Sequence, residues 1–370
     1  MTHAPREVAS DRAVRGWRMG PPPRWGRRAA AVVAIVLVVL LGAGGPAGAD
    51  PAKPTNYRST LTTMKPPTAF VRAQVVGGDG FLQMKVATGH EVVVNGYQDE
   101  PYLRFLKDGT VQENTNSPAT YLNRTRYGSN GVPSSLSGDT LPAPAWKTIG
   151  HGGYAVWHDH RINFMGKDPS VVKGLAQGQP VPWTAVVFTV DGTRVVASGH
   201  YRLLDPPSPL PWLAFNAAVA IAAAVLARRT PILVAATIAA VAGAIGVVVG
   251  VEQNAAIPAG AGATPLTVIL PAVAALAGII ALLRRSTPSG VIAVLASVAA
   301  SGGWVLTRFS VLSKSVLPTD LSPNLDRAGT AVVLGLAVGA AILAVRSGAL
   351  AGVPSESSTG AQASPSGSHP

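Results

Sequence analysis

Long apolar segments dominate the second half of the chain and are separated by short polar connections. Five of them follow one another, each 17 to 21 residues long, at 211–227, 231–251, 264–283, 288–307 and 328–345. A helix of about 20 apolar residues crosses the hydrocarbon core of a bilayer. The pattern therefore predicts an all-α transmembrane bundle of five helices within residues 208–346, with the lipid bilayer as its surroundings.

Positive charge at the ends of these segments predicts their orientation. Arginines follow the first, third and fifth segments, at Arg228-Arg229, Arg284-Arg285 and Arg346. Short loops that carry Lys and Arg remain in the cytoplasm. We therefore expect a multi-pass plasma-membrane protein whose large N-terminal domain is extracytoplasmic. The tail at 347–370, rich in Ser, Gly, Pro and Ala, is expected to be disordered and cytoplasmic.

The first 49 residues have the pattern of a secretory signal peptide. A lead with seven arginines and two acidic residues, at 1–28, precedes thirteen apolar residues at 29–41, and Ala47-Gly48-Ala49 forms an A-x-A site. This order is typical of a signal peptide, here cleaved after Ala49. An uncleaved anchor is the alternative, because the apolar stretch could extend over 29–48 and span the membrane.

Between these apolar regions the chain has the pattern of a β-rich domain. Residues 50–68, rich in Pro, Thr and Lys, are interpreted as a linker to a domain at 69–207. Short runs of β-branched and aromatic residues predict strands at 69–76, 81–86, 91–97, 102–106, 110–113, 154–164, 183–190 and 194–203. Residues 114–148 are interpreted as a long loop.

Three turn signals join neighbouring strands of this domain. They are Gly77-Gly78-Asp79-Gly80, Lys107-Asp108-Gly109 and Asp191-Gly192. Such turns connect antiparallel strands in hairpins. Seven or eight strands without a helical period predict an antiparallel β-sandwich-like domain, of which the immunoglobulin-like arrangement is one form.

Composition narrows the chemistry that the chain can carry. Only 13% of the residues are charged and cysteine is absent, which excludes disulfides, thiolate metal sites and Cys nucleophiles. Most of the net charge of +12 lies beside the apolar segments, since residues 50–207 hold 15 basic and 12 acidic residues. A nucleic-acid-binding domain would carry a basic face, so nucleic acid is not an expected partner.

The interiors of the five predicted spans contain no Asp, Glu, Lys, Arg or His. Pumps and ion-coupled transporters place such groups at membrane depth. Abundant Ala and Gly suit close helix packing. The bundle is therefore interpreted as an anchor, or as a surface that assembles with other membrane proteins, rather than as a proton relay.

The densest group of candidate site residues is the run Tyr-Ala-Val-Trp-His-Asp-His-Arg-Ile-Asn-Phe-Met at 154–165. On a strand, His158 and His160 would share one face, where two imidazoles can bind one metal ion. Further candidate ligands are Met165, His151, His90 and His200. A methionine ligand favours copper, which is the first candidate cofactor. Two alternatives remain: core histidines bonded to the backbone, or a His general base oriented by Asp159 or Glu100.

A second candidate site surrounds the second predicted hairpin. A polar ligand pocket is predicted from Glu100, Tyr102, Arg104, Asp159 and Arg161. On a regular strand, Tyr102 and Arg104 share a face, and Glu113 lies across from Arg104. A cross-strand ion pair, contributing about 0.2–1 kcal/mol, explains the same residues. The neighbouring Asp159 and Arg161 can likewise be an ordinary ion pair.

Five stretches of the chain combine into a sequence pattern that can be compared with known families. They are Gly96-Tyr97, the run from Glu100 to Phe105, the run from Asn116 to Tyr121, Trp157-His158-Asp159-His160-Arg161, and 317–328. Together they resemble an uncharacterised family of actinobacterial multi-pass membrane proteins. The resemblance implies an exported β domain on a helical bundle, a suspected link to copper handling and no established activity. The family pattern has a further His where this chain has Asn163, so the resemblance does not extend to a complete metal site.

These features predict a non-enzymatic envelope protein whose outer domain binds a ligand or a metal. A structural or assembly subunit of a membrane complex is the alternative, followed by an envelope hydrolase and by a facilitator for a neutral solute. No nucleophile elbow, phosphate-binding loop or paired carboxylates in the sequence mark an enzyme.

Overall fold

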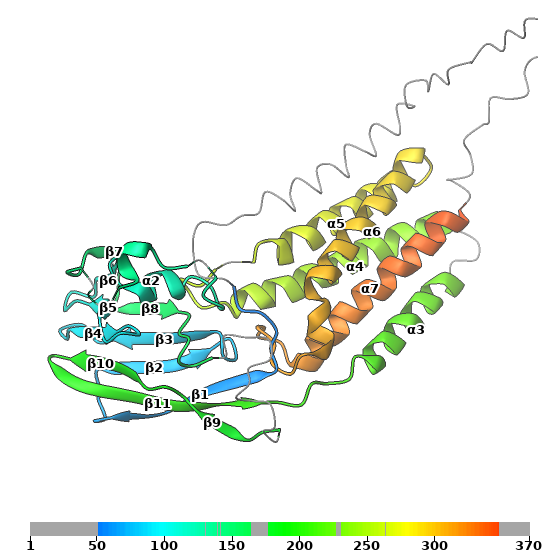
Figure 1. Ribbon diagram of the computed structural model, residues 1–370. Helices are drawn as coiled ribbons and strands as arrows, with labels where there is room; N and C mark the ends of the chain where they lie inside the picture. The colour runs from blue at the N-terminus through cyan, green and yellow to red at the C-terminus, as the bar shows by residue number, and fades with distance from the viewer. Residues whose placement is uncertain are drawn as a thin grey trace, which may run out of the picture.

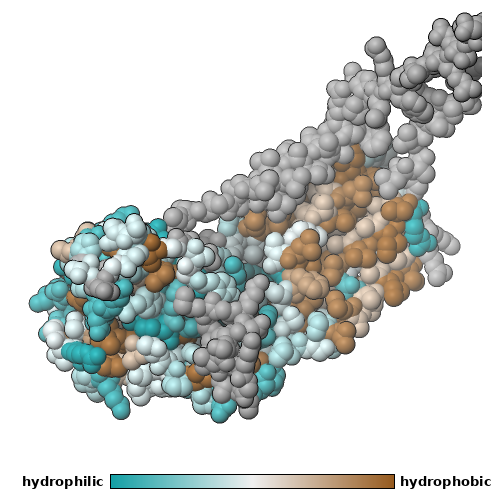
Figure 2. All heavy atoms as spheres, viewed as in Figure 1, coloured by the Kyte–Doolittle hydropathy of each residue, from teal (hydrophilic) through white to brown (hydrophobic). Residues whose placement is uncertain are grey.

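The computed structural model describes residues 51–129, 131–138, 140, 142–163, 177–226, 231–262 and 264–347. The predicted signal peptide at 1–49 and the predicted tail after Ser347 lie outside these ranges. The described chain has two parts, a β-rich domain and a group of helices that follows it (Figure 1). Hydrophobic residues cover the helices, whereas hydrophilic residues cover most of the β-rich domain (Figure 2).

The β-rich domain consists of two antiparallel sheets. The larger has the order β1-β11-β10-β4-β5-β6-β7, with β9 paired to β11, and the smaller has the order β2-β3-β8. The strands are β1 Tyr57–Lys65, β2 Val71–Val76, β3 Phe81–Val86, β4 Val92–Asn95, β5 Pro101–Phe105, β6 Val111–Asn114, β7 Trp146–Gly150, β8 Tyr154–Trp157, β9 Pro180–Pro182, β10 Val186–Val190 and β11 Thr193–Leu203. Two short helices, α2 Pro118–Leu122 and η1 Ser134–Leu136, lie between β6 and β7. The predicted antiparallel β-rich domain is confirmed, whereas the immunoglobulin-like arrangement stays a prediction.

Side chains from both sheets form one hydrophobic core. Phe105 and Phe188 of the larger sheet and Leu82 and Met84 of the smaller sheet are at most 1% exposed and belong to the same cluster. Alternate residues of a strand point to the same side, which is why every second residue of β10 is buried. Burial of each such side chain contributes about 1.5–3 kcal/mol, so the core holds the two sheets together.

The three predicted hairpins are confirmed as β2–β3, β5–β6 and β10–β11. Gly77, Gly109 and Gly192 in their turns have φ of +67°, +86° and +82°. Glycine enters this left-handed region without a steric penalty. These turns are specified locally, which is why the sequence reveals them.

Three interpretations of this domain were wrong. The segment interpreted as a linker contains β1, which pairs with β11 from Tyr57↔Leu203 to Lys65↔Val196. The segment interpreted as a loop at 114–148 contains α2 and runs into β7 at an edge of the larger sheet. The strand predicted at 154–164 ends at Trp157. The residues at which β1, β7 and β8 begin and end are set by pairing with strands that are distant in the sequence. A local sequence pattern does not show which strand will be the partner.

Five apolar helices follow the β-rich domain. They are α3 Leu210–Leu226, α4 Pro231–Ala255, α5 Leu266–Leu283, α6 Pro288–Arg308 and α7 Pro323–Arg346, with the 3₁₀ helix η3 Phe309–Ser313 after α6. Within the described ranges, four of them, α4 to α7, are long and apolar enough to cross a membrane.

The first predicted span differs from the other four. Residues 211–227 were expected to match the others, but α3 has 17 residues in the described part of the chain, one fewer than α5, the shortest of the other four. The prediction of five spans is therefore confirmed for α4 to α7, whereas α3 is a shorter apolar helix that packs beside α7.

Glycines bring the backbones of α4 and α5 into close contact. A Cβ added at Gly243 or Gly278 would overlap backbone atoms of the facing helix, at Ala275 and Ala240. A Cβ at Gly250 would overlap the carbonyl oxygen of Thr267. The small residues of these helices therefore serve packing within this chain.

Replacing Gly250 by alanine is expected to separate α4 from α5 and to lower the melting temperature of the detergent-solubilised chain by several degrees. The added methyl group meets a backbone atom that cannot rotate away, and overpacking of this kind costs about 1–3 kcal/mol. Gly302→Ala in α6 is the matched control, since a Cβ there meets nothing within 4 Å. Equal melting temperatures for the two variants would contradict this packing.

The ends of α6 and α7 near the β-rich domain contain a buried ion pair. Arg308 Nη2 donates to Asp326 Oδ1 over 2.6 Å, and the two side chains are 3% and 1% exposed. Both residues were predicted to lie in a connection, but the helices extend further and include them. The predicted spans themselves hold no ionisable group, but the helices extend beyond them and include ionisable groups at this end. A buried charge is tolerated here because its partner is in place.

The β-rich domain contacts the helices through the connection between α6 and α7. Thr55 forms a β-bridge with Val316. The adjacent Ser315 donates from its backbone to Asn56 Oδ1 and from its hydroxyl to the carbonyl of Asp205. The domain is thus attached to the bundle at the end where α4 ends and α5 begins (Figure 1).

Candidate functional site

The two central histidines do not form the predicted metal pair. Because β8 ends at Trp157, His158 and His160 are not alternate residues of a strand. His158 Nδ1 lies 2.6 Å from the carbonyl oxygen of Gly80, and His160 Nε2 lies 3.1 Å from that of Thr125. Each imidazole therefore bonds to a different backbone carbonyl, as in the structural alternative considered above.

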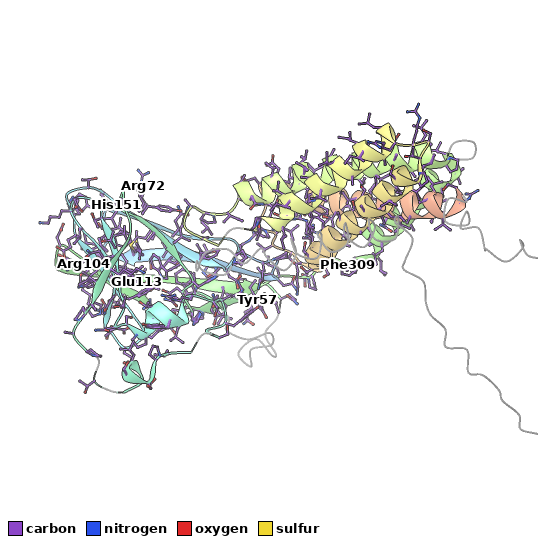
Figure 3. All side chains as sticks on the ribbon, turned by 90° about the horizontal axis from the view of Figure 1, so that it is seen from above. Tyr57, Arg72, Arg104, Glu113, His151 and Phe309 are labelled. Carbon is purple, nitrogen blue, oxygen red and sulfur yellow. The ribbon has the colours of Figure 1, made fainter. Side chains whose placement is uncertain are left out.

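The other candidate metal ligands are also dispersed. His151 is exposed on the turn after β7 (Figure 3), His90 lies 2.6 Å from Asp191, and His200 is on β11 opposite Pro182. Met165 lies outside the described residues. In the part of the chain that the structure describes, no three His, Asp or Glu side chains gather as a metal-binding group. Copper binding therefore gains no support from the described geometry.

Asp159 and Arg161 form a buried ion pair that stabilises the chain after β8. Arg161 Nη2 donates to Asp159 Oδ2 over 2.7 Å, and Arg161 Nε donates to Oδ1 over 2.8 Å. Trp157 Nε1 also donates to Oδ2, and Arg161 Nη1 donates to the carbonyl of Asn95. Burial alone would raise the pKa of Asp159, but the cation and these bonds hold it below its ordinary value. Asp159 and Arg161, both predicted to line a ligand pocket, therefore bond to each other and to neighbouring groups of the domain.

Glu100 and Arg104, also predicted for the pocket, have other partners. Glu100 accepts from Ser117 Oγ at 2.5 Å and from the backbone N–H of Gln98 at 2.8 Å. Arg104 Nη2 donates to Gln112 Oε1 at 2.6 Å. The sheet register places Gln112, not Glu113, opposite Arg104, so the predicted Arg104–Glu113 pair was wrong by one residue.

Glu113, labelled in Figure 3, instead lines a cavity of about 280 Å³ in the β-rich domain. Leu103 and Lys147 are its cross-strand neighbours on β5 and β7. The other lining residues come from β5, β7, β8, the region of α2 and the α4–α5 connection, and are Tyr102, Thr120, Asn123, Arg124, Ile149, Ala155, Val156, Trp157 and Gly260. Of the five residues predicted for a pocket, Tyr102 is the one that lines this cavity.

The charges around this cavity are not paired with one another. Among the described residues, Glu113 makes no ion pair, although Arg124 and Lys147 line the same cavity. Burial raises the pKa of Glu113 above its ordinary value, and the two cations and a hydrogen bond with Thr120 oppose the shift. A carboxyl with a shifted pKa in a cavity is a common sign of a binding or catalytic site.

One wall of the cavity is aromatic and apolar. The rings of Tyr102 and Trp157 meet edge to face with centroids 6.4 Å apart. Burial raises the pKa of the Tyr102 hydroxyl well above its ordinary value, so this group remains a neutral donor. A cavity with one carboxyl, two cations and an apolar wall is suited to a ligand that has both polar and apolar parts.

Sequence reasoning missed Arg124, Lys147, Trp157 and Gly260 as members of this site. A signal was present for β7, because Trp146, Thr148 and Ile149 are residues that favour strands. No local signal links Gly260 to the cavity, since only the folded chain brings the α4–α5 connection there.

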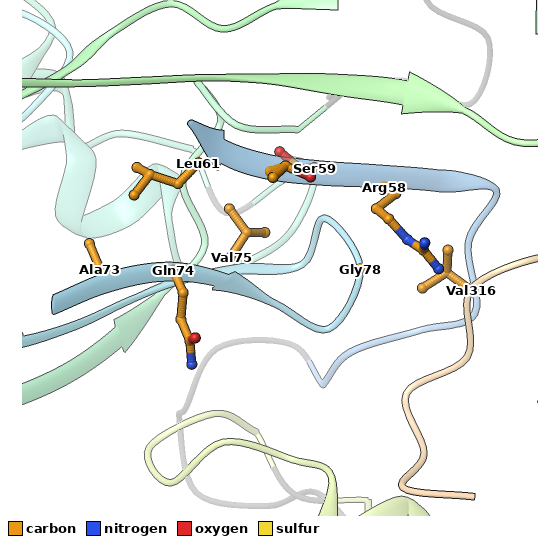
Figure 4. Close-up of a pocket in the computed structure, with 9 residues that line it drawn as sticks. Arg58, Ser59, Leu61, Ala73, Gln74, Val75, Gly78 and Val316 are labelled. Atoms are coloured by element: carbon orange, nitrogen blue, oxygen red, sulfur yellow. The ribbon is translucent and has the colours of Figure 1, made fainter. Parts of the chain in front are cut away.

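A second cavity, of about 350 Å³, lies between β1 and β2 and is closed at one end by Val316 (Figure 4). Leu61, Ala73 and Val75 point into it, and Arg58 is its one charged residue. It holds no carboxyl, so it offers less chemistry than the Glu113 cavity.

Comparison with protein-family models, with curated proteins and with solved structures returns no match.

Proposed function

We propose that this chain is a multi-pass membrane protein of the cell envelope whose extracytoplasmic β-rich domain binds a small ligand in the Glu113 cavity. The observation that carries this proposal is the partly buried Glu113, which makes no ion pair among the described residues, beside two exposed cations in a cavity of about 280 Å³. Burial of this carboxyl is unfavourable for its charged form, and Thr120 and the two cations offset that cost only in part. A ligand that donates hydrogen bonds to it compensates further.

The distribution of arginines supports the proposed orientation. Arg284 and Arg285 follow α5, and Arg346 ends α7, at the end of the bundle away from the β-rich domain. Positive charge marks the cytoplasmic side. With α3 as a fifth crossing beside α7, the β-rich domain then lies outside, and the chain ends in the cytoplasm.

The orientation can be tested with single cysteines, because the natural chain has none. We expect Lys107→Cys, exposed in the β5–β6 turn, to react with a membrane-impermeant maleimide in intact cells. Ser286→Cys, exposed after α5, should react only in inverted vesicles. The reverse labelling pattern would refute the proposed orientation.

Ligand binding can be tested by native mass spectrometry of the full chain extracted from its own membranes. We expect a small-molecule adduct on the wild type that is lost in Val156→Trp, because the indole fills the cavity. Glu91→Gln, on a residue outside the cavity lining, should retain the adduct. An adduct that persists in a folded Val156→Trp chain would place binding elsewhere, and a wild type without any adduct would count against the proposal.

A further inference from the structure

The Glu113 cavity lies beside an apolar connection of the helix bundle. Gly260, one of its lining residues, belongs to the connection 256–265 between α4 and α5. This connection reads Ala-Ile-Pro-Ala-Gly-Ala-Gly-Ala-Thr-Pro and has no charged side chain. A connection between two membrane-length helices lies at the bilayer surface, and an apolar one can rest in it. The cavity is therefore within reach of molecules in the adjacent leaflet.

The cations of the cavity are available to an anionic group. Arg124 and Lys147 are exposed, and neither takes part in an ion pair in the described part of the chain. Arg124 donates from its Nε to the carbonyl of Thr120 and lies over the Tyr121 ring, with 5.7 Å between its Cζ and the ring centroid. Its terminal nitrogens can still donate to an anionic group. A guanidinium and an ammonium together are a common arrangement for binding phosphate.

The remaining lining residues suit two other parts of such a ligand. Leu103, Ile149 and Val156 provide apolar surface, and the Ile149 side chain is still 49% exposed at the rim. Glu113 is an acceptor for hydroxyl groups, which it can bind beside an anion that the two cations hold. A soluble inorganic anion would leave the apolar surface uncovered.

We propose that the ligand of the Glu113 cavity is an anionic, hydroxyl-bearing amphiphile that enters from the adjacent membrane leaflet. Arg124 and Lys147 bind its anionic group, Glu113 accepts from its hydroxyls, and its apolar chain lies along Ile149 and Val156 towards the α4–α5 connection. This inference rests on the proposed function, because it names the class of ligand for the same cavity.

Calorimetric titration of the full chain in dodecyl maltoside tests the ligand class. The probes are dihexanoylphosphatidylglycerol, dihexanoylphosphatidylcholine and glycerophosphoglycerol, which carries the same phosphodiester headgroup without acyl chains. We expect phosphatidylglycerol to bind at least tenfold more tightly than either of the others. Arg124→Gln/Lys147→Gln should weaken its binding by about tenfold or more, because two charge-assisted contacts are lost. The control Lys107→Gln/Arg194→Gln also removes two positive charges, but from residues that do not line the cavity. It should leave the affinity for phosphatidylglycerol unchanged.

The outcomes separate this inference from the proposed function. Equal affinity for glycerophosphoglycerol would show that the ligand is a free anion and would overturn the membrane source. Equal affinity for phosphatidylcholine, or no effect of Arg124→Gln/Lys147→Gln in a chain with wild-type melting temperature, would overturn the role of the cations. If no probe binds while the native adduct is still lost in Val156→Trp, the ligand class is wrong and the binding cavity stands.

Discussion

Replacing Asp326 by alanine is expected to lower the free energy of unfolding by about 3–5 kcal/mol, the usual cost of removing one partner from a buried ion pair. Arg308 would remain among apolar helices with 3% of its side chain exposed and without its carboxylate. Arg308 also lies over the ring of Trp304, with 5.0 Å between its Cζ and the ring centroid. That contact cannot replace the lost charge. The measurement is the melting temperature of the folded chain in detergent, followed by size-exclusion chromatography.

Two further variants distinguish a lost charge pair from a general packing defect. Arg308→Met/Asp326→Leu removes both charges and keeps side-chain volume, so it should be less destabilising than Asp326→Ala alone. Arg346→Ala, which removes an exposed arginine at the other end of the bundle, should leave the melting temperature unchanged. If the double variant is as unstable as Asp326→Ala, the loss of stability does not come from leaving the Arg308 charge without its partner.

Replacing Asp159 by alanine is expected to have an effect of similar size on the β-rich domain, about 3–5 kcal/mol. The substitution removes the acceptor for Trp157 Nε1 and leaves the half-buried backbone and guanidinium donors of Arg161 without their carboxylate. We expect faster hydrogen exchange at residues 92–105 and 154–163, because Arg161 also bonds to the carbonyl of Asn95.

A second substitution at this site provides the control for geometry. Asp159→Asn keeps the shape and one acceptor, so its effect should lie between wild type and Asp159→Ala. Asp108→Ala, which removes an exposed carboxylate that caps Thr110 in a surface turn, should not alter exchange at 154–163. Wild-type exchange in Asp159→Ala would mean that the pair does not hold this segment.

The same carboxylate predicts how stability depends on pH. The pKa of Asp159 is lower in the folded chain than in the unfolded chain, because the cation and hydrogen bonds outweigh burial. A carboxyl with a lowered pKa contributes its full stabilisation above the unfolded pKa of about 3.9. That contribution is lost as the pH falls from there through the folded value. Wild type and Asp159→Asn should therefore differ at neutral pH and converge in acid.

The sequence alone determined the membrane-length helices and the hairpins, because both depend on local properties. An apolar stretch near 20 residues is unfavourable in water wherever it occurs. The Gly-containing turns at Gly77, Gly109 and Gly192 require a backbone conformation that glycine adopts readily. The sequence also drew attention to Tyr102 and Glu113, although it assigned Glu113 to the wrong cross-strand partner.

Only the tertiary structure decided what those residues do. The end of β8 at Trp157 separates His158 from His160, and the register of β5 on β6 places Gln112 opposite Arg104 and Lys147 opposite Glu113. Gly260 reaches the cavity from more than one hundred residues further along the chain. Strand limits, register and the contact between domain and bundle depend on hydrogen bonds and packing between distant segments. No window along the chain contains those partners, so the site could be located only in the folded molecule.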